Sequence, residues 1–174
     1  MKYVFGLFVL LLSGAAIAQM PYAGLQTRQI KALSDQQIGD LRAGRGMGMA
    51  LPAELNGYPG PSHLLELADQ LALRPEQRTR TAALFADMKA EAIPLGERLI
   101  GQESDLDRQF SDKTVSLESL QQATAAAAKT QGELRAAHLK YHLLTVAILD
   151  KQQMDRYSEL RGYTAGAPGH RHHH

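Results

Sequence analysis

The chain has 174 residues, 19 Lys and Arg against 18 Asp and Glu, and no cysteine. The balanced charge argues against a general nucleic-acid binder, which carries a clear basic excess. The lack of cysteine excludes disulfides, thiolate metal sites and Cys nucleophiles. The length suits one domain with a modest core.

The first 18 residues are predicted to be a secretory signal peptide. Lys2 supplies the positive charge, residues 4–12 form an apolar run too short to span a bilayer comfortably, and Ala16 and Ala18 frame a cleavage motif. Cleavage after Ala18 removes one lysine and no acid, which leaves 18 basic and 18 acidic residues. We therefore expect export to the bacterial periplasm, with a retained N-terminal anchor as the alternative.

Residues 19–61 are expected to form a weakly structured N-terminal segment. Apolar residues at near-helical spacing predict a short helix from about Thr27 to Arg42. The following stretch, AGRGMGMALPAELNGYPGPSH, is rich in Gly and Pro and predicts a linker or a loosely packed loop. Met47 and Met49 lie in it as soft donors for Cu(I), but two thioethers alone do not make a copper site.

The ordered domain is expected to span residues 62–163 and to begin with a short helix. Ser62 is a favourable N-cap for the run HLLELADQLAL. Pro75 then marks the first position of a long helix, in which apolar residues recur every three or four positions from Phe85 to Phe110. Pro94 lies inside this helix and predicts a kink.

A second long helix is predicted after the break SDKTVS at residues 111–116. Its apolar stripe runs from Leu117 to Ile148, and its Ala-rich middle favours helix and close packing. Asp150 and Gln153 then resemble a capping box for a last helix, which is followed by a flexible His-rich tail at residues 164–174. The order of elements predicts an all-α fold, an antiparallel hairpin of two long helices flanked by shorter ones.

Two short segments carry a family resemblance. Leu73-Arg74-Pro75-Glu76-Gln77 and Leu149-Asp150-Lys151-Gln152-Gln153 resemble the paired Leu-Thr-x-x-Gln signatures of the periplasmic CpxP/Spy-like superfamily, which includes heavy-metal sensor and resistance proteins. The resemblance covers roughly residues 62–163, and Thr is replaced by Arg74 and Asp150. It implies that the helical hairpin pairs into a curved homodimer. It also implies unfolded protein clients or a membrane-bound sensor or regulator as partners.

His138 and His142 lie four residues apart on the second long helix, where they share one helical face. Hairpin geometry brings His63 to about the same level, and Glu66 shares the helical face of His63. Three imidazoles and a carboxylate form a mixed N/O donor set for zinc, nickel, cobalt or copper. The alternative is two histidines of the core and one exposed histidine at a helix start.

The heavy-metal sensors of the superfamily bind their ion between the first short helix and the late long helix. The resemblance implies a His pair in the first helix and His-x-x-x-Met in the late one. Here Leu67 replaces the second His, and Tyr141 and Thr145 stand where His and Met are expected. Any site in this chain is therefore a variant of that pattern.

The tail holds a second group of potential metal ligands, which are His170, His172, His173 and His174. Such a cluster chelates metal ions loosely. A purification tag is the alternative, but Arg171 interrupts the run.

No catalytic motif accompanies these residues, so we expect a protein that is not an enzyme. Two functions fit the pattern. The first is a periplasmic stress protein that binds transition-metal ions, as in heavy-metal sensing or resistance. The second is an ATP-independent chaperone that holds unfolded clients on a helical cradle.

Overall fold

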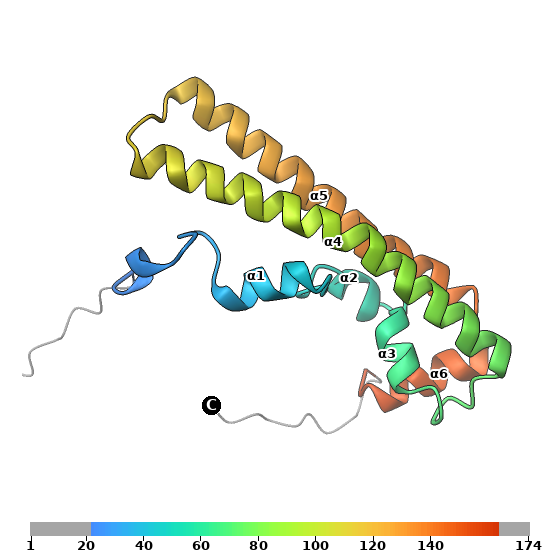
Figure 1. The fold of residues 1–174 in the computed structure, drawn as a ribbon. Coiled ribbons are helices and arrows are strands. Elements are labelled where there is room, and N and C mark those ends of the chain that lie inside the picture. The colour runs from blue at the N-terminus through green and yellow to red at the C-terminus, as the bar shows by residue number, and fades with distance from the viewer. Residues whose placement is uncertain (1–21, 164–174) are drawn as a thin grey trace, which may run out of the picture.

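The computed structural model describes residues 22–163, and within this range the chain is all-α, without a strand. The elements are a 3₁₀ turn η1 (Leu25–Thr27), α1 (Asp35–Arg42), α2 (Leu51–Glu54), α3 (Pro61–Glu66), α4 (Pro75–Ser111), α5 (Leu117–Val146) and α6 (Lys151–Leu160). Helices α4 and α5 pack together as an antiparallel pair (Figure 1). Helices α1 and α2 lie along one side of this pair, and α3 and α6 lie at its base (Figure 1).

The predicted starts of the two long helices are confirmed, because each is set by residues next to it in the chain. Pro75 occupies the first turn of α4, where its missing N–H costs nothing. Ser116 caps α5, since its hydroxyl accepts a hydrogen bond from the amide of Ser119 at 3.1 Å. Asp150 and Gln153 form the predicted capping box of α6. Pro94 lies within α4, which continues through it.

The N-terminal helix was expected from about Thr27, but α1 begins at Asp35. Ser34 and Gln37 form a capping box there, with the Ser34 hydroxyl accepting from the Gln37 amide at 3.2 Å. Apolar spacing alone does not reveal where a helix begins, whereas the cap supplies acceptors for the first free amides. Residues 28–34 form turns and bends instead.

The segment expected to be a linker is packed against the rest of the protein. It contains α2, and Pro59 and Gly60 are buried beside the long helices. Ser62 is not the cap of the next helix, because α3 begins one residue earlier at Pro61, with Gly60 at the N-cap. This helix also ends at Glu66, well before the end of the predicted run, and turns follow.

Two apolar clusters form the core. The first joins α1, α4 and α5 and consists of Ile30, Ile38, Leu41, Ala92, Leu99, Ile100, Ala127 and Leu134. The second joins α3 and α6 and consists of Leu64, Ala68, Leu71, Leu73 and Tyr157. The predicted apolar stripes are buried near the base of the long pair but not at its far end, where Phe110 is 55% exposed and Leu117 is 88% exposed.

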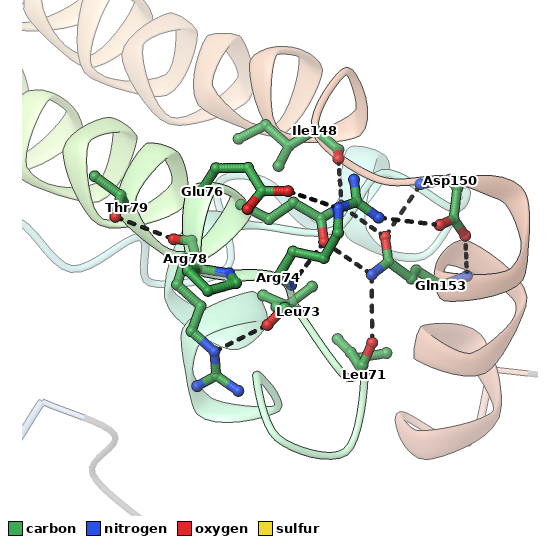
Figure 2. Close-up of polar contacts among 11 residues, drawn as sticks. Leu71, Leu73, Arg74, Glu76, Arg78, Thr79, Ile148, Asp150 and Gln153 are labelled. Atoms are coloured by element: carbon green, nitrogen blue, oxygen red, sulfur yellow. Dashed lines mark hydrogen bonds and ion pairs between the residues drawn. The ribbon is translucent and has the colours of Figure 1, made fainter.

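The two segments that carry the family resemblance meet at the base of the long pair (Figure 2). Gln77 Nε2 donates to Gln153 Oε1 at 2.8 Å, and Gln153 Nε2 donates to Gln77 Oε1 at 3.0 Å. The same nitrogens also donate to the carbonyls of Ile148 and Leu71. Both amides are buried, so this reciprocal pair, here called the glutamine clasp, satisfies polar groups that would otherwise be costly to bury.

Candidate functional site

A cavity of about 550 Å³ lies beside the base of the α4–α5 pair. The loop after α1, helix α3 and the two long helices all contribute to its wall. His63, Glu66, His138 and His142, the four predicted ligands within residues 22–163, all line it. The structure thus brings together residues that are up to 79 positions apart in the sequence.

Glu54, on α2, is the central polar group of this wall and is only 4% exposed. Its carboxylate accepts hydrogen bonds from Tyr157 Oη at 2.5 Å, from Tyr163 Oη at 3.2 Å and from the Gly60 amide at 3.2 Å. Arg161 Nε lies 3.4 Å from Oε1 and supplies a positive charge. The buried charge is therefore compensated by groups from α6 and from the residues after it.

The environment of Glu54 decides its charge. Burial alone would raise the pKa of this carboxyl, but hydrogen bonds from His63 and Tyr157, the charge of His63 and the Gly60 amide lower the pKa from 4.5 to about 2. Glu54 is therefore an ionised acceptor at neutral pH. Burial and the hydrogen bond to Glu54 raise the pKa of Tyr157 far above its usual value, so its hydroxyl remains a donor.

His63 belongs to α3 and is half-buried. Its Nδ1 lies 3.2 Å from Glu54 Oε1. Because an ionised carboxylate only accepts, Nδ1 carries the proton of this hydrogen bond. In the neutral ring, Nε2 is then the atom with a free lone pair, and a carboxylate on Nδ1 is the usual orienting partner of a metal-binding imidazole.

His142, on α5, is only 8% exposed. Its Nδ1 lies 2.6 Å from the carbonyl oxygen of Tyr58 and 3.7 Å from Glu54 Oε2. A carbonyl cannot donate, so Nδ1 carries the proton here too, and Nε2 holds the lone pair of the neutral ring. The ring packs so closely on Gly60 that a Cβ at that position would lie 2.9 Å from Nε2.

His138 lies one turn before His142 and is 2% exposed. Its Nε2 is buried and has no hydrogen-bond partner among the described residues. Burial lowers the pKa of His138, and the neighbouring His142 lowers it further, so the ring is neutral at pH 7. A buried nitrogen without a partner is unfavourable, which marks His138 as a group that a ligand would satisfy.

The other candidate ligands are placed differently. Glu66 is exposed at the cavity wall and accepts a hydrogen bond from Ser62 Oγ at 3.3 Å. Met47 also lines the cavity and is 41% exposed, whereas Met49 packs against the first apolar cluster. The four tail histidines at positions 170 and 172–174, like the predicted signal peptide, lie outside the described residues.

Among residues 22–163, no three His, Asp or Glu side chains are already grouped closely enough to hold a metal ion. The cavity is instead lined by His63 and His142, whose Nδ1 atoms face oxygen acceptors, and by His138, whose buried Nε2 has no partner among the described residues. Such a wall supplies neutral nitrogen donors. For one ion to bind, the three rings would have to move until their Nε2 atoms lie within coordination distance of a common point.

The sequence did not identify Glu54 as a member of this site. It lies in the Gly- and Pro-rich stretch that was predicted to be a linker. The available signal was Pro52 followed by an acid, which is typical of a first helical turn. A helix of four residues is too short to show a periodic pattern, so this signal alone does not predict a buried carboxylate.

The fold and the cavity define an all-α protein with an imidazole-lined cavity at the base of two long helices. Comparisons of the chain with protein-family models, with curated proteins and with solved structures found no match. None of the described helices combines the length and apolarity that crossing a membrane requires.

Proposed function

We propose that the chain is a non-enzymatic periplasmic stress protein that binds a transition-metal ion, as in heavy-metal sensing or resistance. His63, His138 and His142 supply the nitrogen donors in this proposal. Glu54 orients His63, and Glu66 or water completes the coordination. Zinc, nickel, cobalt and copper(II) are the ions that such a donor set suits.

The observation that carries the proposal is the buried, unpartnered Nε2 of His138, a residue that lines the same cavity as two oriented imidazoles. A purely structural histidine in a core normally has both nitrogens satisfied or exposed. The hydrogen bonds at the Nδ1 atoms of His63 and His142 leave Nε2 for an ion, and a metal-binding imidazole commonly donates its other N–H to a carboxylate or carbonyl oxygen in this way.

Metal binding in this proposal requires a small rearrangement. The half-exposed ring of His63 is the part of the donor set with most freedom to move, since His138 and His142 are held on α5. Fixing the ring of His63 in one orientation costs conformational entropy, so the affinity for the ion is lower than at a preformed site.

Isothermal titration calorimetry with zinc, nickel, cobalt and copper tests the proposal. The chain should carry Ser in place of His170, His172, His173 and His174, so that the tail does not bind metal. We expect micromolar or tighter binding of at least one ion. His63→Ala should weaken it about tenfold or more, as loss of one ligand implies.

His138→Leu separates a ligand from a structural residue. The substitution removes an unpartnered buried nitrogen, so the metal-free variant should be as stable as the parent or more stable. Its metal binding should nevertheless be lost. The proposal is wrong if the parent binds none of the four ions, or if His138→Leu binds them as the parent does.

The homodimer and the chaperone function remain further proposals. They are supported by large apolar side chains that are exposed on and directly after α2, at the far end of the long pair and on α5, namely Leu51, Leu55, Phe110, Leu117, Leu143 and Leu144. Sedimentation velocity tests the dimer, and suppression of client aggregation by the metal-free protein tests the chaperone.

A further inference from the structure

The cavity is much larger than a single metal ion. Its volume of about 550 Å³ lies within the range of about 300 to 1,000 Å³ that is typical of sites for small organic ligands. Apolar side chains also line it, including Phe85 and Met88 of α4. An ion on the three histidines would leave most of this space to another molecule.

Lys89 gives the cavity a positive charge that no acid neutralises within the described part of the chain. It lines the cavity, and its Nζ lies 5.8 Å from the centre of the Phe85 ring. No carboxylate of residues 22–163 lies within ion-pair distance of this ammonium group. Arg45 also lines the cavity, but its guanidinium is paired with Asp40 at 2.6 Å. Lys89 is therefore the cation that can bind an added anion.

The loop after α1 forms part of the same cavity wall as this lysine and His138. A Cβ at Gly44 would lie 3.7 Å from Lys89 Cα, and one at Gly46 would lie 3.5 Å from His138 Nδ1. The amides of Gly46, Met47 and Gly48 donate to no acceptor among the described residues. Met47 and Gly48 both have positive φ, at 43° and 78°. Successive free amides in such a loop favour an anion.

The charges of the cavity wall favour an anionic ligand that binds together with the metal ion. Three neutral imidazoles add no negative charge to balance a divalent cation. Glu54 is already held by Arg161, Tyr157 and Tyr163, which leaves Glu66 as the other carboxylate of the wall. Three nitrogen donors also leave coordination positions open.

We propose that the cavity binds its metal ion together with a small polycarboxylate, whose free carboxylate contacts Lys89 and the amides of residues 46–48. This inference rests on the proposed function, because the histidines hold the ion. It adds the class of ligand that the site takes, a metal chelate with an anionic organic ligand.

Equilibrium dialysis with nickel and labelled citrate tests the inference. Citrate chelates nickel, so it competes with the protein unless the protein binds the chelate itself. With the tail histidines replaced by Ser, we expect citrate to be retained in a one-to-one ratio with nickel, and only when nickel is present. Lys89→Met should reduce the retained citrate about tenfold or more, as loss of a charge-assisted hydrogen bond implies.

Two variants and one competing ligand complete the design. Lys89→Arg keeps the positive charge and should retain citrate, and Lys129→Met, which removes an exposed lysine of α5 outside the cavity, should match the parent. Nickel bound to ethylenediamine, which carries no carboxylate, should not be retained as a chelate. Retention of nickel without citrate overturns this inference and leaves the proposed function standing. Retention of neither also overturns this inference, and the calorimetry with the four ions in the absence of citrate then decides the proposed function.

Discussion

Glu54 connects the cavity to the C-terminal part of the fold through a single carboxylate. Its Oε1 is shared by His63 on the cavity side and by Tyr157, Tyr163 and Arg161 on the α6 side. The strength of these contacts depends on the negative charge, because hydrogen bonds to an ionised group are about twice as strong as neutral ones. The protonation state of this residue therefore affects both the cavity wall and the docking of α6.

We predict that Glu54 makes the protein sensitive to acid. Its pKa is about 2 in the folded state against an ordinary 4.5, so folding favours the ionised form. The stability that this charge contributes is present above the ordinary pKa and is lost as pH falls from about 5 to about 2, with a total of about 3 kcal/mol. Urea unfolding at a series of pH values measures the loss.

Glu54→Gln should be less stable at neutral pH and should lack this part of the acid-induced loss. Glu66→Gln is the matched control, since Glu66 is an exposed carboxylate of the same cavity. Parallel acid profiles for the parent and Glu54→Gln would show that the charge of Glu54 does not stabilise the fold.

At the scale of the helices, α1 is held against α4 by a close approach of backbones. Gly96 is buried in the middle of α4, and a Cβ there would lie 2.5 Å from the carbonyl oxygen of Leu41. Only a residue without a side chain allows α1 to lie at this distance. The approach buries Ile38 and Leu41 in the first apolar cluster.

We predict that Gly96→Ala destabilises the protein although alanine is the better helix former. Helix propensity alone would favour alanine by about 1 kcal/mol. The clash with a backbone atom should outweigh this gain, at a cost of about 1 to 3 kcal/mol. Thermal unfolding followed by circular dichroism measures the difference.

Gly101 provides the matched control on the same helix. A Cβ at this position meets nothing within 4 Å, so Gly101→Ala should stabilise the protein by about 0.5 to 1 kcal/mol. If Gly96→Ala raised the stability as much as Gly101→Ala, the proposed close contact of α1 with α4 would be incorrect.

For the molecule as a whole, the glutamine clasp ties the beginning of α4 to the beginning of α6. Gln77 and Gln153 are 76 residues apart, and each also bonds a carbonyl of the other part of the chain. The clasp lies where the end of α5, the turn before α4 and α6 converge (Figure 2). It therefore fixes the position of α6, whose Tyr157 reaches Glu54.

We predict that substitutions of the two glutamines have strongly non-additive effects on the free energy of unfolding. Gln77→Leu removes two hydrogen bonds of the buried Gln153 amide and leaves the carbonyl of Ile148 without a partner among the described residues, at a cost of about 1 to 3 kcal/mol. The double variant Gln77→Leu, Gln153→Leu should lose less stability than the sum of the losses of the two single variants.

Gln152→Leu is the control. This substitution, at an exposed neighbouring position, should change stability by less than about 0.5 kcal/mol. If urea unfolding showed that the losses of stability in the two single variants add up in the double variant, the hydrogen bonds of the glutamine clasp would not couple the two residues.

The helical class and the beginnings of α4, α5 and α6 were predictable because the signals are local. Pro75 suits a first helical turn because no N–H is needed there, and the side chains of Ser116 and Asp150 each accept from the amide three residues on. The start of α1 was predicted too early because apolar spacing continued past its real boundary at Ser34. The packing of residues 43–61 was missed because Gly and Pro interrupt every periodic pattern there.

The candidate site was likewise predicted only in the part that follows from spacing along the chain. Hairpin geometry predicted that His63 and the pair on α5 lie at one level, and the cavity contains all three. The residues of the long helices and the histidines that share a face were predictable from the amino-acid order, since both follow from spacing along one helix. The contacts of Glu54 with His63 and of Gln77 with Gln153, and the unpartnered nitrogen of His138, became known from the folded structure. These contacts join residues from different elements, and their distances depend on packing that no local pattern encodes.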